Sequence, residues 1–339
     1  MPGKMRTVAV TCPTRATFNS FLIVRNLIVR ALAGRAVASD AAAKADLHVH
    51  VGLPERAQRA FYDGSGDTPL VFYSFAEATS IPPHWTETFN RCAEVWVPSE
   101  FSRAVFRACG VAVPIRLVPL GVDPPRPGSE REGDPSPRPF TILWQGTTLR
   151  RVVDGRIEDG DRKRGHLVET AFRRAALPDS RLVLKWIPYA TPACEMRAGA
   201  VWYLCGVHTP LQTARLDRAV DLFVWPTMGE GFGLVPLEKM ARGSASLVTN
   251  WSGPTEYLPD YPGAGLDGYE LREVTFNGVS AQMAVVDQEA LVEALRSAHA
   301  RRDELHAGRA ERVRITAERW SFERKMRPAV VEAVDRMLG

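Results

Sequence analysis

The sequence predicts an α/β fold built from two Rossmann-like, doubly wound domains. At 339 residues, the chain is long enough for two domains with separate hydrophobic cores. Short apolar runs typical of buried strands alternate with amphipathic helical stretches in both halves. Between the halves, residues 124–139 (PPRPGSEREGDPSPRP) are rich in proline, glycine and charge, which is typical of a semi-extended linker. We therefore expect a first domain at residues 1–123, a second domain at 140–319, and a final segment at 320–339.

The composition is that of an ordinary soluble globular protein, with 45% hydrophobic and 24% charged residues. The net charge of +4 is compatible with an anionic ligand, but it requires neither nucleic acid nor a membrane surface. The five cysteines are scattered without C-x-x-C spacing, so we expect free thiols in a reducing, cytoplasmic environment. No apolar run reaches about 18 residues and a strand begins almost at the N-terminus, so we expect neither a transmembrane helix nor a signal peptide.

The first half is expected to alternate strands and helices. Apolar runs predict strands within residues 5–11, 46–51, 70–75, 94–101 and 115–123, and helices at 21–34 and 83–91. Ser99 is placed to cap a further helix. Arg25 and Arg30 interrupt the apolar surface of the first helix. We favour a helix packed on the sheet over one that lies in a membrane surface.

Three polar residues of the first half are candidates for a site. His48 and His50 face the same side of a strand, which is the spacing of metal ligands. No nearby cysteine or carboxylate completes a metal site, so we expect no metal. Either histidine is placed to line the cleft between the two domains, and we assign His50 to the acceptor side. Glu77 follows strand 70–75, at the end of the strand where open α/β sheets bind their ligands.

The clearest functional signal lies in the second half, after the predicted strand 221–225. Further strands are expected within residues 140–144, 182–187, 201–206 and 245–249, and helices at 166–174, 211–220, 288–298 and 301–319. Three glycines at 229, 231 and 233 allow a close approach of the backbone to a bulky ligand. Pro236 suits the first turn of a helix and Gly243 its end. The N-terminus of that helix favours an anion, because its free N–H groups and its dipole point at the ligand.

Two carboxylates bracket this anion site: Glu230 in the loop and Glu238 in the first turn of the helix. A carboxylate beside a phosphate is useful when it holds hydroxyl groups or stabilises a cation. A nucleotide sugar supplies a diphosphate, several hydroxyls and an anomeric carbon that becomes cationic during transfer. The alternative is that Glu238 only complements the helix dipole and that Glu230 is solvated. The glycines and the proline in register favour the nucleotide sugar.

Several segments resemble retaining GT-B glycosyltransferases of the GT4 family. Glu230 and Glu238 resemble the family's E-x7-E signature, and Trp225-Pro226-Thr227 resembles its (V/W)PS segment. Residues 251–256 (WSGPTE) resemble its small-residue loop ending in Glu, and 162–172 (RKRGHLVETAF) its RKGGDLLIEAF helix start. The first domain also resembles that of the family but is shorter than usual.

The resemblance implies a GT-B fold, in which two Rossmann-like domains face across a cleft and the final helix returns to the first domain. It implies that Glu230 holds sugar hydroxyls, that Glu238 binds ribose, and that Arg162 and Lys163 hold the donor diphosphate. A one-residue shift of the alignment would give Arg164 a diphosphate role. The backbone positions implied in donor binding are Gly206, Gly231, Phe232, Gly233 and Leu234. Because fixed cations can stabilise a leaving diphosphate, neither a metal ion nor another cofactor is expected.

The leading interpretation is therefore a retaining, metal-independent glycosyltransferase. It would move a sugar from a nucleoside-diphosphate donor to a hydroxyl of a glycan, a lipid-linked sugar or a small metabolite, with Glu77 and His50 on the acceptor side. A hydroxymethylated base in DNA is a less favoured acceptor. The positive net charge and the basic stretch 150–164 are the features that suggest it. A non-catalytic nucleotide-sugar sensor or partner subunit is the alternative of another class. Any membrane contact would be peripheral.

Overall fold

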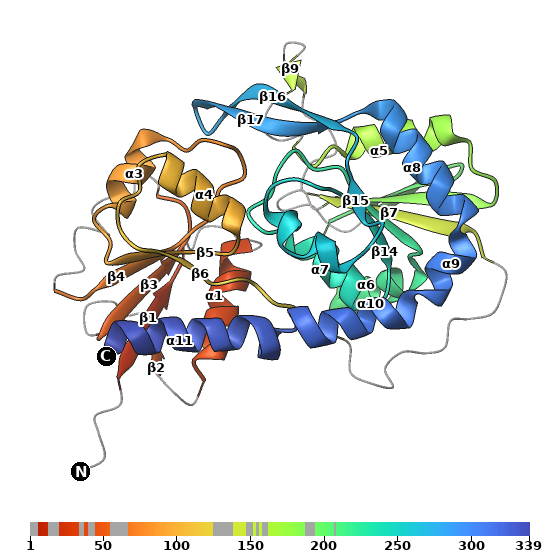
Figure 1. The fold of residues 1–339 in the computed structure, drawn as a ribbon. Coiled ribbons are helices and arrows are strands. Elements are labelled where there is room, and N and C mark those ends of the chain that lie inside the picture. Colours follow the sequence, from red (N-terminus) through yellow and green to blue (C-terminus); the bar gives the residue numbers. More distant parts are fainter. Residues whose placement is uncertain are drawn as a thin grey trace. The chain divides into compact units, whose positions relative to one another are not determined.

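The computed structural model describes residues 6–12, 20–33, 37–39, 45–54, 67–124, 138–146, 152–153, 156–157, 162–186, 194–206 and 208–339. The chain divides into two compact units (Figure 1). The first comprises Met1–Gly121, Val274–Gln282 and Trp320–Gly339, and the second Val122–Glu273 and Met283–Arg319. Most of the predicted linker, residues 125–137, lies outside the described part of the chain.

The first unit contains a parallel sheet in the order β2-β1-β3-β4-β5-β6. Its strands are β1 (Thr7–Thr11), β2 (Val37–Ser39), β3 (Leu47–Val51), β4 (Leu70–Tyr73), β5 (Glu94–Val97) and β6 (Ile115–Leu117). The strand β2 was not predicted, because three residues are too few to show a period. The strand order reverses between β1 and β3, which makes the ends of these two strands the switch point where such sheets bind ligands.

The described part of the first unit contains the helices α1 (Ser20–Ala31), α3 (Pro83–Phe89), α4 (Glu100–Ala108) and α11 (Arg327–Leu338). The N-terminus of α4 is capped as predicted, since the Ser99 side chain accepts a hydrogen bond from the backbone of Ser102. Aromatic rings from the sheet, α3 and α4 pack together in the core. The ring centroid of Phe89 lies 5.3 Å from that of Phe72 and 4.9 Å from that of Phe106. The terminal helix α11 lies against α1 (Figure 1).

The second unit contains a larger sheet in the order β11-β12-β10-β7-β13-β14-β15. Its strands are β7 (Phe140–Gly146), β10 (Ser180–Trp186), β11 (Cys194–Ala198), β12 (Val201–Cys205), β13 (Leu222–Trp225), β14 (Ala245–Thr249) and β15 (Gly265–Leu266). All neighbours pair in parallel except the edge strand β11. Numbered from β7, the six parallel strands follow the order 3-2-1-4-5-6 of a dinucleotide-binding Rossmann sheet, with the switch point between β7 and β13.

The helices of the second unit follow its strands along the chain. They are α5 (Gly165–Ala175), α6 (Pro210–Ala219), α7 (Leu234–Ala241), α8 (Gln288–Ala300), α9 (Arg302–Ala307) and α10 (Arg309–Ile315), with 3₁₀ turns at Gly253–Glu256 and Leu258–Asp260. The prediction of one continuous helix at 301–319 was wrong. Gly308 separates α9 from α10, and a π-helical turn, Thr316–Trp320, follows. Glycine is a poor helix former, which accounts for the break at Gly308.

Two hairpins were not predicted. The longer one joins β16 (Tyr269–Phe276) to β17 (Val279–Val286), and the shorter one joins β8 (Val152–Val153) to β9 (Arg156–Ile157). At the turn of the longer hairpin, Asn277 and Gly278 have φ angles of 49° and 78°. Positive φ at both central residues is the requirement of a tight hairpin turn, and Asn-Gly is its strongest sequence signal. No helix in the described part of the chain is long and apolar enough to cross a membrane.

Candidate functional site

The segments that carry the sequence signal meet at the switch point of the second sheet. The strands β7 and β13 are neighbours there, and each leads into a functional segment at its carboxyl end. Residues 162–164 follow β7 and precede α5, while residues 226–233, here called the glycine loop, follow β13 and precede α7. Two helix N-termini therefore lie at the edge where Rossmann sheets bind their ligands.

The glycines of this region are needed for close packing and for backbone conformation. Gly233 precedes α7 with a φ of +85°, and a Cβ there would lie 2.7 Å from the hydroxyl of Tyr257. A Cβ on Gly253 would lie 2.4 Å from the backbone of Gly231 and Phe232. The 3₁₀ turn that begins at Gly253 thus supports the glycine loop from behind, through direct contact between two backbones.

Glu230 is the centre of a polar cluster. Only 7% of its surface is exposed, and its Oε1 accepts hydrogen bonds from Arg162 at 2.6 Å, from Thr227 at 3.0 Å and from Lys163. Its backbone N–H donates to the hydroxyl of Ser252 at 2.9 Å. The carboxylate is therefore held on several sides and is not solvated.

The electrostatics keep this carboxylate charged. Burial would raise the pKa of Glu230, but the positive charges of Arg162 and Lys163, with hydrogen bonds from Lys163 and Thr227, bring the pKa below its usual value. The two cations and the carboxylate neutralise one another in part, which leaves the cluster with an excess of positive charge. Such a cluster is suited to an anionic ligand.

The two cations are themselves fixed by aromatic and backbone contacts. The Lys163 ammonium lies 4.1 Å from the ring centroid of Trp225, and the indole N–H of Trp144 donates to the Lys163 carbonyl at 2.8 Å. The Arg162 carbonyl accepts from the backbone of Met228 at 2.9 Å, which ties residue 162 to the glycine loop. Arg164 is buried and has a φ of 56°, in the left-handed region, immediately before α5.

Glu238 lies in a second polar cluster. It is the fifth residue of α7, so its predicted position in the first helical turn was wrong: the helix begins at Leu234, directly after Gly233. Burial raises the pKa of Glu238, and the Asp217 carboxylate raises it further, against the lowering effect of nearby cations that include Lys239 and Lys185. This part of the site thus contains carboxyl and ammonium groups buried side by side.

Lys185 is a member of this second cluster that the sequence analysis did not single out. It lies near the end of β10, is 4% exposed, and makes a hydrogen bond of 3.5 Å to the hydroxyl of Thr213. Burial, and then the charge of Lys239, lowers the pKa of Lys185. A lysine inside the apolar run 182–187 (LVLKWI) is the sequence signal that would have found it.

The remaining donor-side positions lie at the same edge of the sheet. Gly206 directly follows β12, with a φ of +86°, and its N–H donates to the carbonyl of Trp186 at the end of β10. Gly231 and Phe232 belong to the glycine loop and are buried, and Leu234 begins α7. Of the residues missed, Thr227 and Ser252 contact Glu230 and both lie in segments adjoining the E-x7-E signature.

The predicted acceptor-side residues belong to the first unit. His50 lies near the end of β3, and the Thr11 hydroxyl is within hydrogen-bond distance of His48 Nε2 (2.7 Å) and His50 Nδ1 (2.9 Å). Burial lowers the pKa of His48 to about 4, and burial together with the His48 charge lowers that of His50 to about 3. This neutral cluster sits at the switch point of the first sheet. Glu77 is half-buried in the bend after β4.

Among the described residues, no group of three or more histidine, cysteine, aspartate or glutamate side chains is arranged to hold a metal ion. The two predicted cations, Arg162 and Lys163, both pair with the Glu230 carboxylate.

The architecture is similar to that of several solved structures. The sucrose-phosphate synthase from Thermosynechococcus elongatus superposes with a TM-score of 0.64 and 14% identity, over 98% of both chains. WaaG, a glycosyltransferase involved in lipopolysaccharide biosynthesis, does so with a TM-score of 0.59 and 15% identity, over 98% of this chain and all of that one. The chain has the GT-B fold.

The predicted fold class is thereby confirmed, and these GT-B neighbours are retaining glycosyltransferases. A third neighbour is the pneumococcal O-GlcNAc transferase GtfA in complex with UDP and GlcNAc, with a TM-score of 0.58 and 12% identity. It is matched over 86% of this GT-B chain, which spans only 57% of the length of GtfA. The sequence matches no protein-family model and no curated protein.

Proposed function

We propose that this protein is a retaining glycosyltransferase of the GT4 type that moves a sugar from a nucleoside-diphosphate donor to a hydroxyl acceptor. The observation that carries the proposal is the Glu230 cluster: a buried, charged carboxylate between two cations, at the switch point of a Rossmann sheet and beside two helix N-termini. The GT-B neighbours and the complex of GtfA with UDP support it.

In the proposed complex, the donor diphosphate lies against Arg162, Lys163 and the amides of the glycine loop. The phosphate oxygens would replace Glu230 as partners of the two cations, and the freed carboxylate would accept hydrogen bonds from the sugar hydroxyls. Glu238 would hold the ribose, and the base would lie near Gly206 and the end of β10.

The proposed chemistry follows from where charge develops. As the bond between the anomeric carbon and the phosphate oxygen breaks, negative charge accumulates on the diphosphate and positive charge on the anomeric carbon. Arg162 and Lys163 stabilise the first, and the Glu230 carboxylate the second, without a change in their own positions. The acceptor hydroxyl attacks the anomeric carbon, and its proton passes to the departing diphosphate oxygen as the new glycosidic bond forms.

On the acceptor side we propose the switch point of the first unit. Thr11, His48 and His50 offer neutral hydrogen-bonding groups there, because burial keeps both imidazoles uncharged near pH 7. Neutral donors and acceptors suit a hydroxyl group better than a phosphate. Glu77, after β4, is the candidate carboxylate of this side.

The test is sugar release from UDP-, GDP- and ADP-sugars, by the wild type and by Glu230→Gln and Lys163→Met. We expect release from one donor class by the wild type and a loss of at least about a hundredfold in both variants, the usual scale for removing one transition-state contact. Glu293→Gln, which changes an exposed carboxylate of α8, is the matched control and should keep full activity.

Two outcomes would redirect the proposal. Tight donor binding without turnover on any hydroxyl acceptor would favour the non-catalytic sensor or partner subunit. Transfer to hydroxymethylated DNA, with a steep dependence on salt, would favour a nucleic-acid acceptor. No binding of any nucleotide sugar would refute the proposed function itself.

A further inference from the structure

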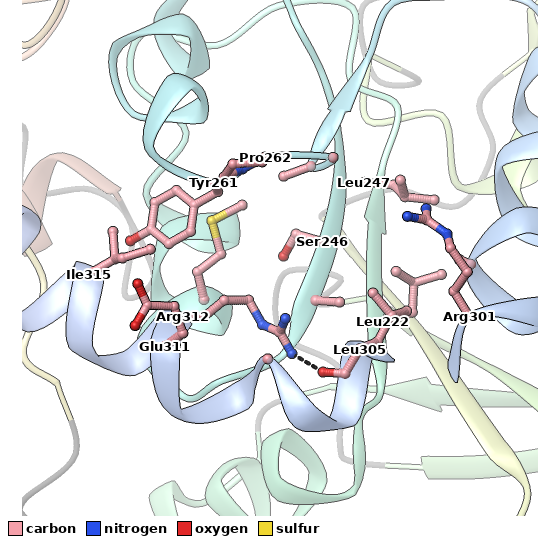
Figure 2. A pocket seen from close by; sticks show the side chains of 16 residues that line it. Leu222, Ser246, Leu247, Tyr261, Pro262, Arg301, Leu305, Glu311, Arg312 and Ile315 are labelled. Atoms are coloured by element: carbon pink, nitrogen blue, oxygen red, sulfur yellow. Dashed lines mark hydrogen bonds between the residues drawn. The ribbon is translucent and has the colours of Figure 1, made fainter. Parts of the chain in front are cut away.

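A cavity lies in the second unit, away from the Glu230 cluster (Figure 2). This cavity, here called the rear pocket, encloses about 200 Å³ between helices α9 and α10 and the first residues of β13 and β14. Leu222 begins β13 and Ala245 begins β14, whereas the glycine loop follows the end of β13. Because these strands are parallel, the rear pocket is at the opposite edge of the sheet.

The walls of the rear pocket are mostly apolar and include one unsatisfied polar group. Among the lining residues are Leu222, Met240, Leu247, Ala298, Leu305 and Ile315. Ser246 also lines the pocket, is 4% exposed, and its hydroxyl has no hydrogen-bond partner among the described residues. A buried hydroxyl without a hydrogen-bond partner destabilises the fold, so its presence in a cavity wall points to a ligand that completes it.

Two arginines give the rear pocket a positive charge. Neither Arg301 nor Arg312 forms an ion pair with a carboxylate in the described part of the chain, and the Arg312 guanidinium donates to backbone carbonyls instead (Figure 2). Burial, and then the charge of Arg309, lowers the pKa of Arg312 to about 10. Glu311 lines the pocket as well, but Arg314 binds both of its oxygens, at 2.6 and 2.8 Å.

We propose that the rear pocket binds a small carboxylate with an apolar body, and that this ligand is an effector of the glycine loop. The carboxylate would accept hydrogen bonds from the Ser246 hydroxyl and the two guanidinium groups, while the body packs against the apolar walls. A cavity of about 150 Å³ takes a benzene molecule, so by proportion the rear pocket takes about eight carbon atoms, the number in octanoate, with the two carboxylate oxygens beside Ser246 and the arginines.

Two physical connections lead from the rear pocket to the glycine loop. Helix α7 begins directly after Gly233 and carries Met240, a lining residue, near its other end. Tyr261 also lines the pocket, and its ring lies 6.5 Å from that of Tyr257, whose hydroxyl donates to the Gly233 carbonyl at 2.8 Å. A ligand that packs against Met240 and Tyr261 thus restrains both supports of the loop, and we expect it to reduce the loop's motion.

The test uses octanoate as the probe, with octanamide as the uncharged control, and contains no nucleotide. Binding is measured by calorimetric titration, and the loop by hydrogen exchange of peptides covering residues 229–241. We expect a Kd on the order of 1 mM or tighter for octanoate, weaker binding of octanamide, and slower exchange in the loop when octanoate is bound.

Three variants connect the result to the pocket. Ser246→Leu fills the cavity and should weaken octanoate at least about tenfold. Arg301→Gln removes an exposed charge, cannot disturb the core, and should weaken it roughly threefold to fivefold. Arg302→Gln, one residue further and outside the lining, is the matched control and should change nothing.

The proposal is overturned if octanoate does not bind saturably, if octanamide binds equally well, or if Ser246→Leu and Arg301→Gln both bind it like the wild type. Binding that leaves exchange in residues 229–241 unchanged overturns the effector role. This inference rests on the proposed glycosyltransferase function only for the identity of the ligand that the glycine loop binds. Because no nucleotide is present, the failure of this test is distinguishable from the failure of that function.

Discussion

Replacing Glu230 by glutamine should destabilise the protein and, at the same time, increase its affinity for a nucleoside diphosphate. The carboxylate lies between Arg162 and Lys163, whose side chains are each 16% exposed, and its own side chain is 10% exposed. Removing one partner of a buried ion pair costs about 3–5 kcal/mol. Because the amide keeps the shape and one acceptor oxygen, we expect about 3 kcal/mol, or a fall in Tm of roughly 6–12 °C.

The effect on ligand affinity has the opposite sign, since the same carboxylate competes with the incoming phosphates. Two unit charges about 4 Å apart interact by about 4 kcal/mol at an effective dielectric constant near 20. Movement of the freed side chain and screening by salt reduce this repulsion. We therefore expect its removal to improve the binding free energy by about 1.4 kcal/mol, which is tenfold in Kd. Isothermal titration of UDP, GDP and ADP into the wild type and Glu230→Gln measures it, and a melting scan measures the stability.

The pH dependence of stability gives an internal check on this variant. The pKa of Glu230 is lower in the folded protein than in the unfolded chain, so its contribution is present above the unfolded value of about 4.3 and is lost as the pH falls through the folded pKa. Glu230→Gln should lack that acid-labile part. A variant that melts like the wild type and binds the nucleotide no more tightly would show that the pairing at Glu230 does not govern the site.

Three further predictions concern the packing against the glycine loop, the buried histidines of the first unit and a buried ion pair of the second. Gly253→Ala places a Cβ 2.4 Å from the backbone of the glycine loop, so we expect nucleotide affinity, measured by titration, to fall at least about tenfold. His48 and His50 have pKa values of about 4 and 3 in the folded protein, so the unfolded chain binds more protons than the folded one below about pH 6.5. The free energy of unfolding, measured by urea titration, should therefore fall by roughly 1.4 kcal/mol per pH unit for each histidine between about pH 6.5 and 4. His48→Gln should make this pH dependence less steep. Asp217→Asn leaves the buried Lys239 ammonium without its carboxylate and should cost about 3–5 kcal/mol in the same assay; equal stability would contradict the pairing.

The local features of the donor side could be predicted from the sequence because each rests on a short-range rule. A strand followed by glycines, with Pro236 inside the next helix and Gly243 beyond its end, has one common structural solution, and α7 adopts it. The same kind of rule was available for the hairpin after residue 269, where Asn277-Gly278 lies between two runs of alternating residues. That signal was overlooked, although it was present in the sequence.

Other features of the site required the topology of the sheet. Arg162 and Glu230 are 68 positions apart, and they meet because β7 and β13 pair as neighbours in the sheet. No periodicity in either segment encodes that pairing. Lys185 illustrates the same limit, since its neighbours Glu238 and Lys239 lie on a helix more than fifty residues away along the chain.

The charges at the two switch points argue for a division of labour that neither sheet order alone would suggest. The second unit concentrates two cations, a charged carboxylate and two helix N-termini at the reversal between β7 and β13, which suits a diphosphate. At the reversal between β1 and β3, the first unit places Thr11 and two imidazoles that burial keeps neutral, and the Arg25 guanidinium donates to the nearby Val10 carbonyl. Thr11 and the two neutral imidazoles can both donate to and accept from a hydroxyl group, and they bring no charge to balance a diphosphate. If that is correct, Thr11→Val should raise the KM for the acceptor and leave nucleotide affinity unchanged, and a loss of nucleotide affinity in this variant would place the donor, instead, against the first unit.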